Sequence, residues 1–250
     1  MKNTTTALAA AALLALTACG GSDSYTPPPQ AAPTPVPAPT PVASTISVDF
    51  SQGIDGWIPG VADYFDDDAP SETGYGWSKL PPGTGLSGMG FYLTSHNNSD
   101  NVMTYVKHQY SGFVPGAKYS LTFSLTHATD ASQDCFGAGG SRGASIYMVA
   151  AASGDEPKTV KQANGEYRMN LDRGNNAESG TQGKVLGLLG SEELECGGAG
   201  WAKVTRKLDD TIAVTADKEG KLWIVLGTDS GFESANALYL LSATVNVKPQ

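Results

Sequence analysis

The stretch that decides the fold is Tyr119-Ser120-Leu121-Thr122-Phe123-Ser124-Leu125, in which apolar side chains alternate with hydroxyl side chains. A similar alternation runs through Ile46-Ser47-Val48-Asp49-Phe50. Successive side chains of a strand point to opposite faces, so this pattern indicates strands with one buried face and one polar face.

Further segments have the composition of strands, and Gly and Pro clusters separate them. No window of ordinary helix length shows a clean period of 3.6 residues. About ten short strands with turn-rich connections predict an all-β fold, an antiparallel β-sandwich of the jelly-roll type. The further predicted strands are 89–95, 101–110, 143–151, 166–171, 184–189, 201–208, 211–216, 221–227 and 236–247.

The N-terminal segment has the features of an export signal. Lys2 precedes an apolar run over 7–15, and Leu16-Thr17-Ala18-Cys19 closes that run. The run is too short to cross a bilayer as a helix, and its order of charge, apolar run and small residues is that of a secretory signal. The segment resembles the signal peptide and lipobox of bacterial lipoproteins. An ordinary secretory signal with a chance cysteine is the alternative.

The lipoprotein resemblance implies cleavage before Cys19 and acyl chains, such as palmitate, on that residue. Two or more chains suffice for a stable membrane anchor. The expected location is therefore the cell envelope, and Gly20 after the cysteine favours the outer membrane if the cell is Gram-negative.

Composition divides the chain into three parts. Residues 1–18 are the predicted signal peptide, 19–44 the lipidated N-terminus with a Pro-rich linker, and 45–250 the β-sandwich domain. Eight prolines fall within 27–41, a composition that favours polyproline II and cannot pack a core.

The charge of the chain excludes one class of partner. The formal net charge is −9 and no Lys/Arg cluster is present, so we expect no binding to nucleic acid. For the same reason, the lipid rather than surface charge would hold the protein on a membrane.

Two cysteines remain if Cys19 is lipidated, namely Cys135 and Cys196. Exported compartments are oxidising, so a disulfide between these residues is expected. Two free thiols, or half of a metal site, are the alternatives.

Two phrases resemble the galactose-binding-like jelly-roll domains of carbohydrate-binding modules. One is Phe50-Ser51-Gln52-Gly53-Ile54-Asp55-Gly56-Trp57, and the other runs from Gly112 through Pro115-Gly116 into the alternating strand that ends at Phe123. The resemblance implies a β-sandwich that often binds carbohydrate and often carries a structural calcium ion. It does not by itself transfer either property.

An acidic and aromatic segment over 63–77 is the expected binding loop. Aromatic rings offer flat faces to sugar C–H groups, and carboxylates accept hydrogen bonds from hydroxyls. The alternative is a solvated loop whose rings fold back on the sandwich. Trp57, in contrast, is predicted to plug one end of the core. The expected ligand-binding residues are Tyr64, Tyr75, Trp77 and Asp67.

Calcium is the one ion that the composition favours, because oxygen ligands are plentiful and no HxH or HExxH motif is present. No EF-hand pattern occurs, so the ligands would come from separate segments. The candidate calcium ligands are Asp63, Asp66, Asp68, Asp229 and Glu233.

Catalysis is not expected. Residues 139–143 match the GxSxG motif, but all three histidines precede Ser141, whereas that motif needs a later His. Asp67 and Glu233 could form a glycosidase pair only if the fold brought them together.

The sequence thus predicts a membrane-anchored envelope lipoprotein whose β-sandwich binds a ligand, with carbohydrate as the favoured ligand. The alternatives are a structural envelope lipoprotein that binds a protein partner, and a glycosidase or peptidase.

Overall fold

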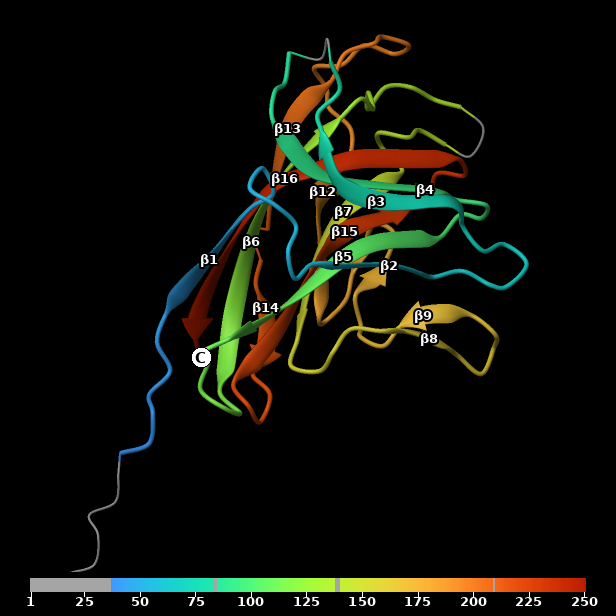
Figure 1. The fold of residues 1–250 in the computed structure, drawn as a ribbon. Coiled ribbons are helices and arrows are strands. Elements are labelled where there is room, and N and C mark those ends of the chain that lie inside the picture. The colour runs from blue at the N-terminus through green and yellow to red at the C-terminus, as the bar shows by residue number, and fades with distance from the viewer. Residues whose placement is uncertain (1–36, 83–84, 138–139, 209) are drawn as a thin grey trace, which may run out of the picture. The chain divides into compact units, whose positions relative to one another are not determined.

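The computed structural model describes residues 37–82, 85–137, 140–208 and 210–250 (Figure 1). The predicted signal peptide, Cys19 and most of the predicted linker lie outside these residues. The sandwich belongs to one compact unit, Pro39–Gln250. Within the described residues, no helix is long and apolar enough to cross a membrane.

All regular elements of the described residues are strands. They are β1 (Ser44–Asp49), β2 (Ile58–Ala62), β3 (Ser71–Lys79), β4 (Met89–His96), β5 (Val102–Ser111), β6 (Lys118–Thr129), β7 (Ile146–Ser153), β8 (Thr159–Lys161), β9 (Tyr167–Met169), β10 (Gly174–Asn175), β11 (Glu178–Ser179), β12 (Gly183–Leu188), β13 (Ala202–Lys207), β14 (Ile212–Thr215), β15 (Lys221–Ser230) and β16 (Ala235–Pro249).

Two antiparallel sheets form the sandwich, which confirms the predicted fold class. Sheet A has seven strands in the order β13-β6-β16-β4-β3, with β1 paired to β16 and β14 paired to β6. Sheet B has five strands in the order β12-β7-β15-β5-β2. Figure 1 shows the two sheets layered, with the β8–β9 hairpin lying beyond β2.

The core lies between the inner faces of the two sheets and follows from the alternation in the sequence. Leu121, Phe123 and Leu125 of β6 are buried there, whereas the intervening hydroxyl residues point outward. Leu222, Ile224 and Leu226 of β15 fill the facing side from sheet B. Burying one such side chain contributes about 1.5–3 kcal/mol.

Five strands were not expected from the sequence, namely β2, β3, β8, β10 and β11. The segment over 63–77 was expected to be a loop, but its last part belongs to β3, an end strand of sheet A. Gly74 and Gly76 weaken the strand pattern there, and the large residues that follow them, Tyr75 and Trp77, are exposed rather than buried.

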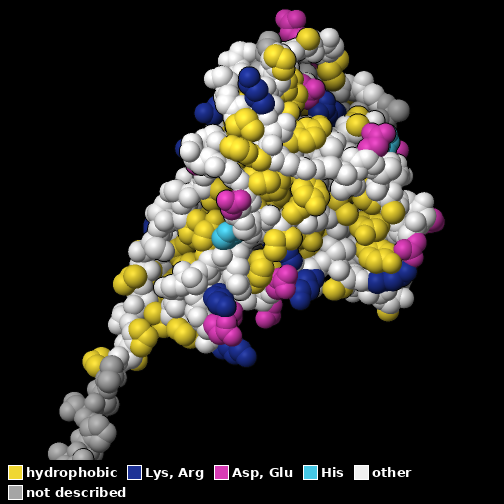
Figure 2. Space-filling view, in the orientation of Figure 1, with side chains coloured by type: hydrophobic (Ala, Val, Ile, Leu, Met, Phe, Trp, Pro, Cys, Tyr) yellow, Lys and Arg dark blue, Asp and Glu magenta, His cyan; other side chains and the backbone are white. Residues whose placement is uncertain are grey.

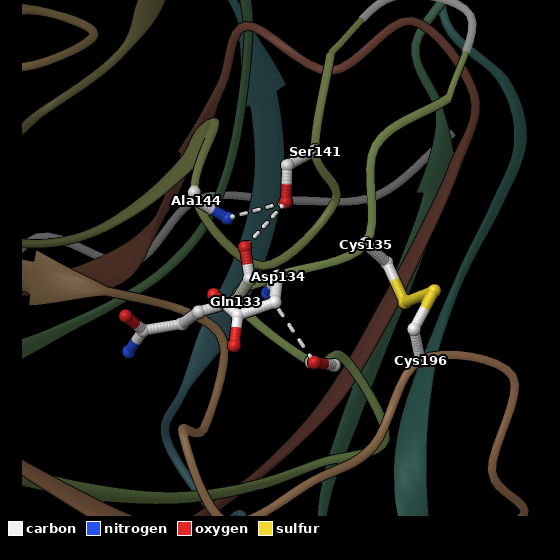
Figure 3. The surroundings of a disulfide bond; sticks show 7 residues. Gln133, Asp134, Cys135, Ser141, Ala144 and Cys196 are labelled. Atoms are coloured by element: carbon white, nitrogen blue, oxygen red, sulfur yellow. Dashed lines mark hydrogen bonds between the residues drawn. A yellow bond between two sulfur atoms is a disulfide. The ribbon is translucent and has the colours of Figure 1, made fainter.

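The predicted disulfide is confirmed. Cys135, in the loop after β6, is bonded to Cys196, between β12 and β13 (Figure 3). Ser141 of the GxSxG match is buried beside this loop. Its hydroxyl donates to the Gln133 carbonyl at 3.0 Å and accepts from the Ala144 N–H at 3.3 Å, so this hydroxyl holds the loop together.

Candidate functional site

One edge of the sandwich is formed by β2 of sheet B and β3 of sheet A. Among the described strands, β2 pairs only with β5 and β3 pairs only with β4. The outer edge of each strand therefore has backbone N–H and C=O groups that no sheet partner uses. We call this region the β2/β3 edge.

Two exposed aromatic side chains stand on the β2/β3 edge. Tyr75 is 62% exposed and Trp77 is 47% exposed. They lie two residues apart on β3, opposite Leu93 and Phe91 of β4. Residues opposite each other in a sheet share a face, so both rings start from the core side of sheet A yet remain open to solvent. Figure 2 shows hydrophobic side chains gathered across the face that it presents.

The Trp77 ring is held in place. Its indole Nε1–H donates to the Phe50 carbonyl at 2.8 Å. Phe50 is fully buried and packs edge-on against Trp57, with 5.2 Å between ring centroids. Trp57 packs against the core as predicted, and it directly precedes β2. Both tryptophans thus contact Phe50. Trp57 is partly buried against the core, and Trp77 is exposed.

A narrow cleft of about 90 Å³ opens between the two strands of this edge. Pro59 and Val61 of β2 form one side and Tyr75 forms the other. Thr104 lies at the cleft as well; its hydroxyl is 2.7 Å from the hydroxyl of Ser95, on the facing sheet. Both of these hydroxyl residues are buried.

The other two predicted ligand-binding residues lie elsewhere. The Tyr64 ring stacks on Tyr167 of β9, with centroids 5.0 Å apart and planes 10° apart. Burial raises the pKa of Tyr64 above its ordinary value. Asp67 is exposed and does not line the cleft. Only Tyr75 and Trp77 of the predicted set therefore share one surface.

The predicted calcium ligands are not brought together. Among the residues that the structure describes, no three His, Cys, Asp or Glu side chains form a group that could hold a metal ion. Asp66 pairs with Lys161 at 2.5 Å, and Asp68 accepts a hydrogen bond from the Phe65 N–H at 2.6 Å. Glu233 is exposed.

The remaining two candidates, Asp63 and Asp229, do meet, but with an arginine between them. Arg173 forms ion pairs with both carboxylates, and all three side chains are buried. The Asn176 N–H donates to the same Asp229 oxygen at 2.5 Å. Burial raises the pKa of Asp229, and the guanidinium opposes this effect. In this structure the positive charge between these two candidate ligands is therefore the Arg173 guanidinium.

Little in the sequence indicates the cleft itself. Pro59 and Val61 belong to a strand that begins Ile58-Pro59-Gly60, and Pro and Gly argue against a strand unless it lies at an edge. The tolerance of edge strands for Pro and Gly is therefore the signal by which β2 could have been found. Thr104 sits within a run of buried residues on β5, and only the facing sheet shows that it reaches the cleft.

The comparisons with known proteins bear on the fold of the chain and not on its function. No protein-family model matches the chain, and no curated protein matches it. Among solved structures, the chain is similar to the K1 cleaved adhesin domain of Lys-gingipain from Porphyromonas gingivalis W83, with 16% identity, 83% of this chain and 99% of that chain covered, and a TM-score of 0.34.

Two further similar structures are carbohydrate-binding proteins by name. TmCBM61, solved in complex with beta-1,4-galactotriose, has 10% identity, covers 79% of this chain and 92% of its own, and has a TM-score of 0.35. The mannan-recognising carbohydrate-binding module TmCBM27 has 10% identity, coverages of 83% and 96%, and a TM-score of 0.29. These sequence identities and TM-scores are too low to support a function, so the function is argued from the geometry of the site.

Proposed function

We propose that this domain binds carbohydrate at the β2/β3 edge, with Tyr75 and Trp77 as the stacking surface. The observation that carries the proposal is the pair of exposed rings on one strand, of which Trp77 is fixed by its hydrogen bond to Phe50. A fixed ring loses little conformational freedom when a ligand binds. Its face takes the C–H groups of a sugar, and backbone groups on the outer edge of β3 can bond hydroxyls. On β2, the Val61 carbonyl already accepts from the Thr159 hydroxyl at 2.6 Å.

The proposal includes no catalytic step. Ser141 is engaged in its own loop, and the buried carboxylates Asp63 and Asp229 are paired with Arg173. The role that fits these residues is structural.

We further propose that acyl chains on Cys19 anchor the protein in the cell envelope, with the outer membrane as its site in a Gram-negative cell. The support is the lipobox-like sequence that ends at this residue. Replacing the thiol, as in Cys19→Ser, should move the protein from the membrane fraction to the soluble fraction. A variant that still pellets with membranes without detergent would contradict the anchor.

A screen of the purified full chain against a glycan array tests the binding proposal. Trp77→Ala should weaken binding to any glycan found by more than about tenfold, because truncating a stacked aromatic anchor commonly costs about 2 kcal/mol or more. Phe136→Ala is the matched control, since Phe136 is 84% exposed and does not line the cleft. It should leave binding unchanged. Repeating the screen with and without calcium tests the calcium prediction.

A protein partner is the second candidate, and one observation favours it. The free edge of β3 could pair with a strand of another chain. If the array gives no binding while a purified envelope protein binds the wild-type chain and not a Gly76→Pro variant, the structural lipoprotein becomes the better description.

A further inference from the structure

The cleft of the β2/β3 edge is sized for a substituent rather than for a sugar ring. Its volume of about 90 Å³ is well below the roughly 300–1,000 Å³ of pockets that enclose a whole small molecule. The cleft therefore suits a substituent of a sugar, with the pyranose ring outside. Tyr75 belongs both to the wall of the cleft and to the exposed aromatic surface, so a sugar stacked on the rings would have its substituents at the entrance.

The walls of the cleft are apolar on both sides. Pro59 and Val61 line it from β2, and Leu93 of β4 lies beneath. A hydroxyl or hydroxymethyl group placed against these side chains would lose bonds to water that apolar walls cannot replace, which is unfavourable. A methyl group would instead be removed from water at a gain. The walls therefore favour a substituent that ends in a methyl group.

The hydroxyl of Thr104 is the buried polar group that the cleft offers. The other hydroxyl residues that line it are Thr73 and Tyr75, which are exposed, and Tyr105, whose hydroxyl lies 3.1 Å from that of Thr159. Thr104 is 4% exposed and Ser95 is 2% exposed. Their hydroxyl oxygens lie 2.7 Å apart, and either can donate to the other. When Ser95 donates, the Thr104 hydrogen is free to point to an acceptor in the cleft. A carbonyl oxygen on the entering group would provide that acceptor.

We propose that the cleft takes the acetamido group of an N-acetylated sugar, with the methyl against Val61 and the carbonyl oxygen toward Thr104. This inference rests on the proposed function, since the sugar ring must first stack on Tyr75 and Trp77. A 6-deoxy sugar would satisfy the walls but would make no hydrogen bond to the threonine hydroxyl, so it would use only one of the two features of the cleft. The acetamido group satisfies both features.

The test compares two neutral oligosaccharides of equal length, one of β-1,4-linked N-acetylglucosamine and one of β-1,4-linked glucose. Both offer the same ring faces, and they differ at the substituent on C2. The wild-type full chain should bind the acetamido oligomer at least about tenfold more tightly by calorimetry, because a methylene in a hydrophobic pocket changes discrimination by roughly 10–200-fold. A rhamnose-containing oligosaccharide tests the deoxy-sugar alternative.

Val61→Phe fills the cleft and should remove the preference, lowering affinity for the acetamido oligomer to that for the glucose oligomer. Ile58→Phe is the matched control, because Ile58 lies on the same strand but opposite Lys107, on the other face of β2. It should keep the preference. Thermal melting of each variant establishes that it is folded.

The outcomes separate the two proposals. Equal affinity of wild type for the two oligomers, or tighter binding of the rhamnose oligosaccharide, overturns the acetamido inference and leaves carbohydrate binding intact. A preference that survives in folded Val61→Phe overturns it too. Binding of no oligosaccharide overturns the proposed function, and the inference falls with it. The wild-type comparison alone can decide, even if the filled variant does not fold.

Discussion

The two edges of the sandwich differ in how the two sheets contact each other. At the edge formed by β12 and β13, side chains of sheet A bond backbone carbonyls at the end of β12 and directly after it. Arg206 of β13 donates to the carbonyls of Leu188 and Gly190 at 2.7 and 2.6 Å. The ring Nε2 of His127, in β6, lies 2.8 Å from the carbonyl of Leu189. We call this region the β12/β13 edge.

The β2/β3 edge has another composition. The contact between its sheets is one buried hydroxyl pair, Ser95 and Thr104, together with apolar side chains. Tyr75 and Trp77 remain exposed. Hydrogen bonds to three successive carbonyls fix one edge, whereas the other keeps an open cleft and two exposed rings, of which Trp77 is held by a hydrogen bond. The difference indicates that the first edge stabilises the fold and the second is available to a ligand.

The largest effect should come from the disulfide, which attaches the connection between β12 and β13 to the loop after β6. Replacing Cys135 and Cys196 by Ser should lower the free energy of unfolding by about 4 kcal/mol, since the bridge closes a loop with a sequence separation of 61 residues. Chemical denaturation measures this change. Glycan binding by the folded variant should persist, because the β2/β3 edge is not involved. A loss of binding in folded protein would remove the distinction between the edges.

Acid should lower the stability of the folded protein through His127, at the β12/β13 edge. Burial lowers the pKa of this imidazole to about 4, from an ordinary value of 6.5. In the unfolded chain His127 therefore binds a proton below about pH 6.5, whereas in the folded protein it binds one only below about pH 4. Stability present at pH 7 is lost as the pH falls through this window, by about 3 kcal/mol in total.

Denaturation series at pH 7 and pH 4.5 measure the effect of this histidine. His127→Gln should be less stable than wild type at pH 7 but should lose less stability on acidification. If the two proteins show the same pH dependence, His127 does not control the acid response of this edge.

A smaller difference should separate the two tryptophans that flank Phe50. Trp57→Ala empties a site packed against the core and should cost about 3 kcal/mol of stability. Trp77→Ala removes a half-exposed ring and one hydrogen bond and should cost about 1 kcal/mol. Thermal melting of both variants measures the difference of about 2 kcal/mol. Equal costs would make Trp77 a core residue and would weaken the case for a stacking surface.

The strands of the core could be read from the chain because burial and local pattern agree there. Tyr119-Ser120-Leu121-Thr122-Phe123 lies in β6 with its apolar residues inward. β3 was missed because its large residues, Tyr75 and Trp77, alternate with glycines and face solvent. An edge strand with an exposed face lacks the buried side chains on which pattern reasoning depends.

The candidate site was predicted in part. The aromatic pair Tyr75 and Trp77 could be chosen because rings in an acidic, polar segment are unusual unless they bind or pack. Tyr64 could not be separated from them, since its partner Tyr167 is far away in the sequence. The same holds for Asp63 and Asp229, whose partner Arg173 comes from a third segment.

The sequence by itself determined the periodic core, the sandwich class and the pair of cysteines that form the bridge. Each of these depends on local alternation or on a count, which a linear chain displays. The tertiary structure alone decided that β2 and β3 end their sheets at the same edge, that Val61, Tyr75 and Thr104 meet around one cleft, and that an arginine joins Asp63 to Asp229. These features depend on which strands lie opposite each other, and contacts between distant segments form only when the two sheets pack.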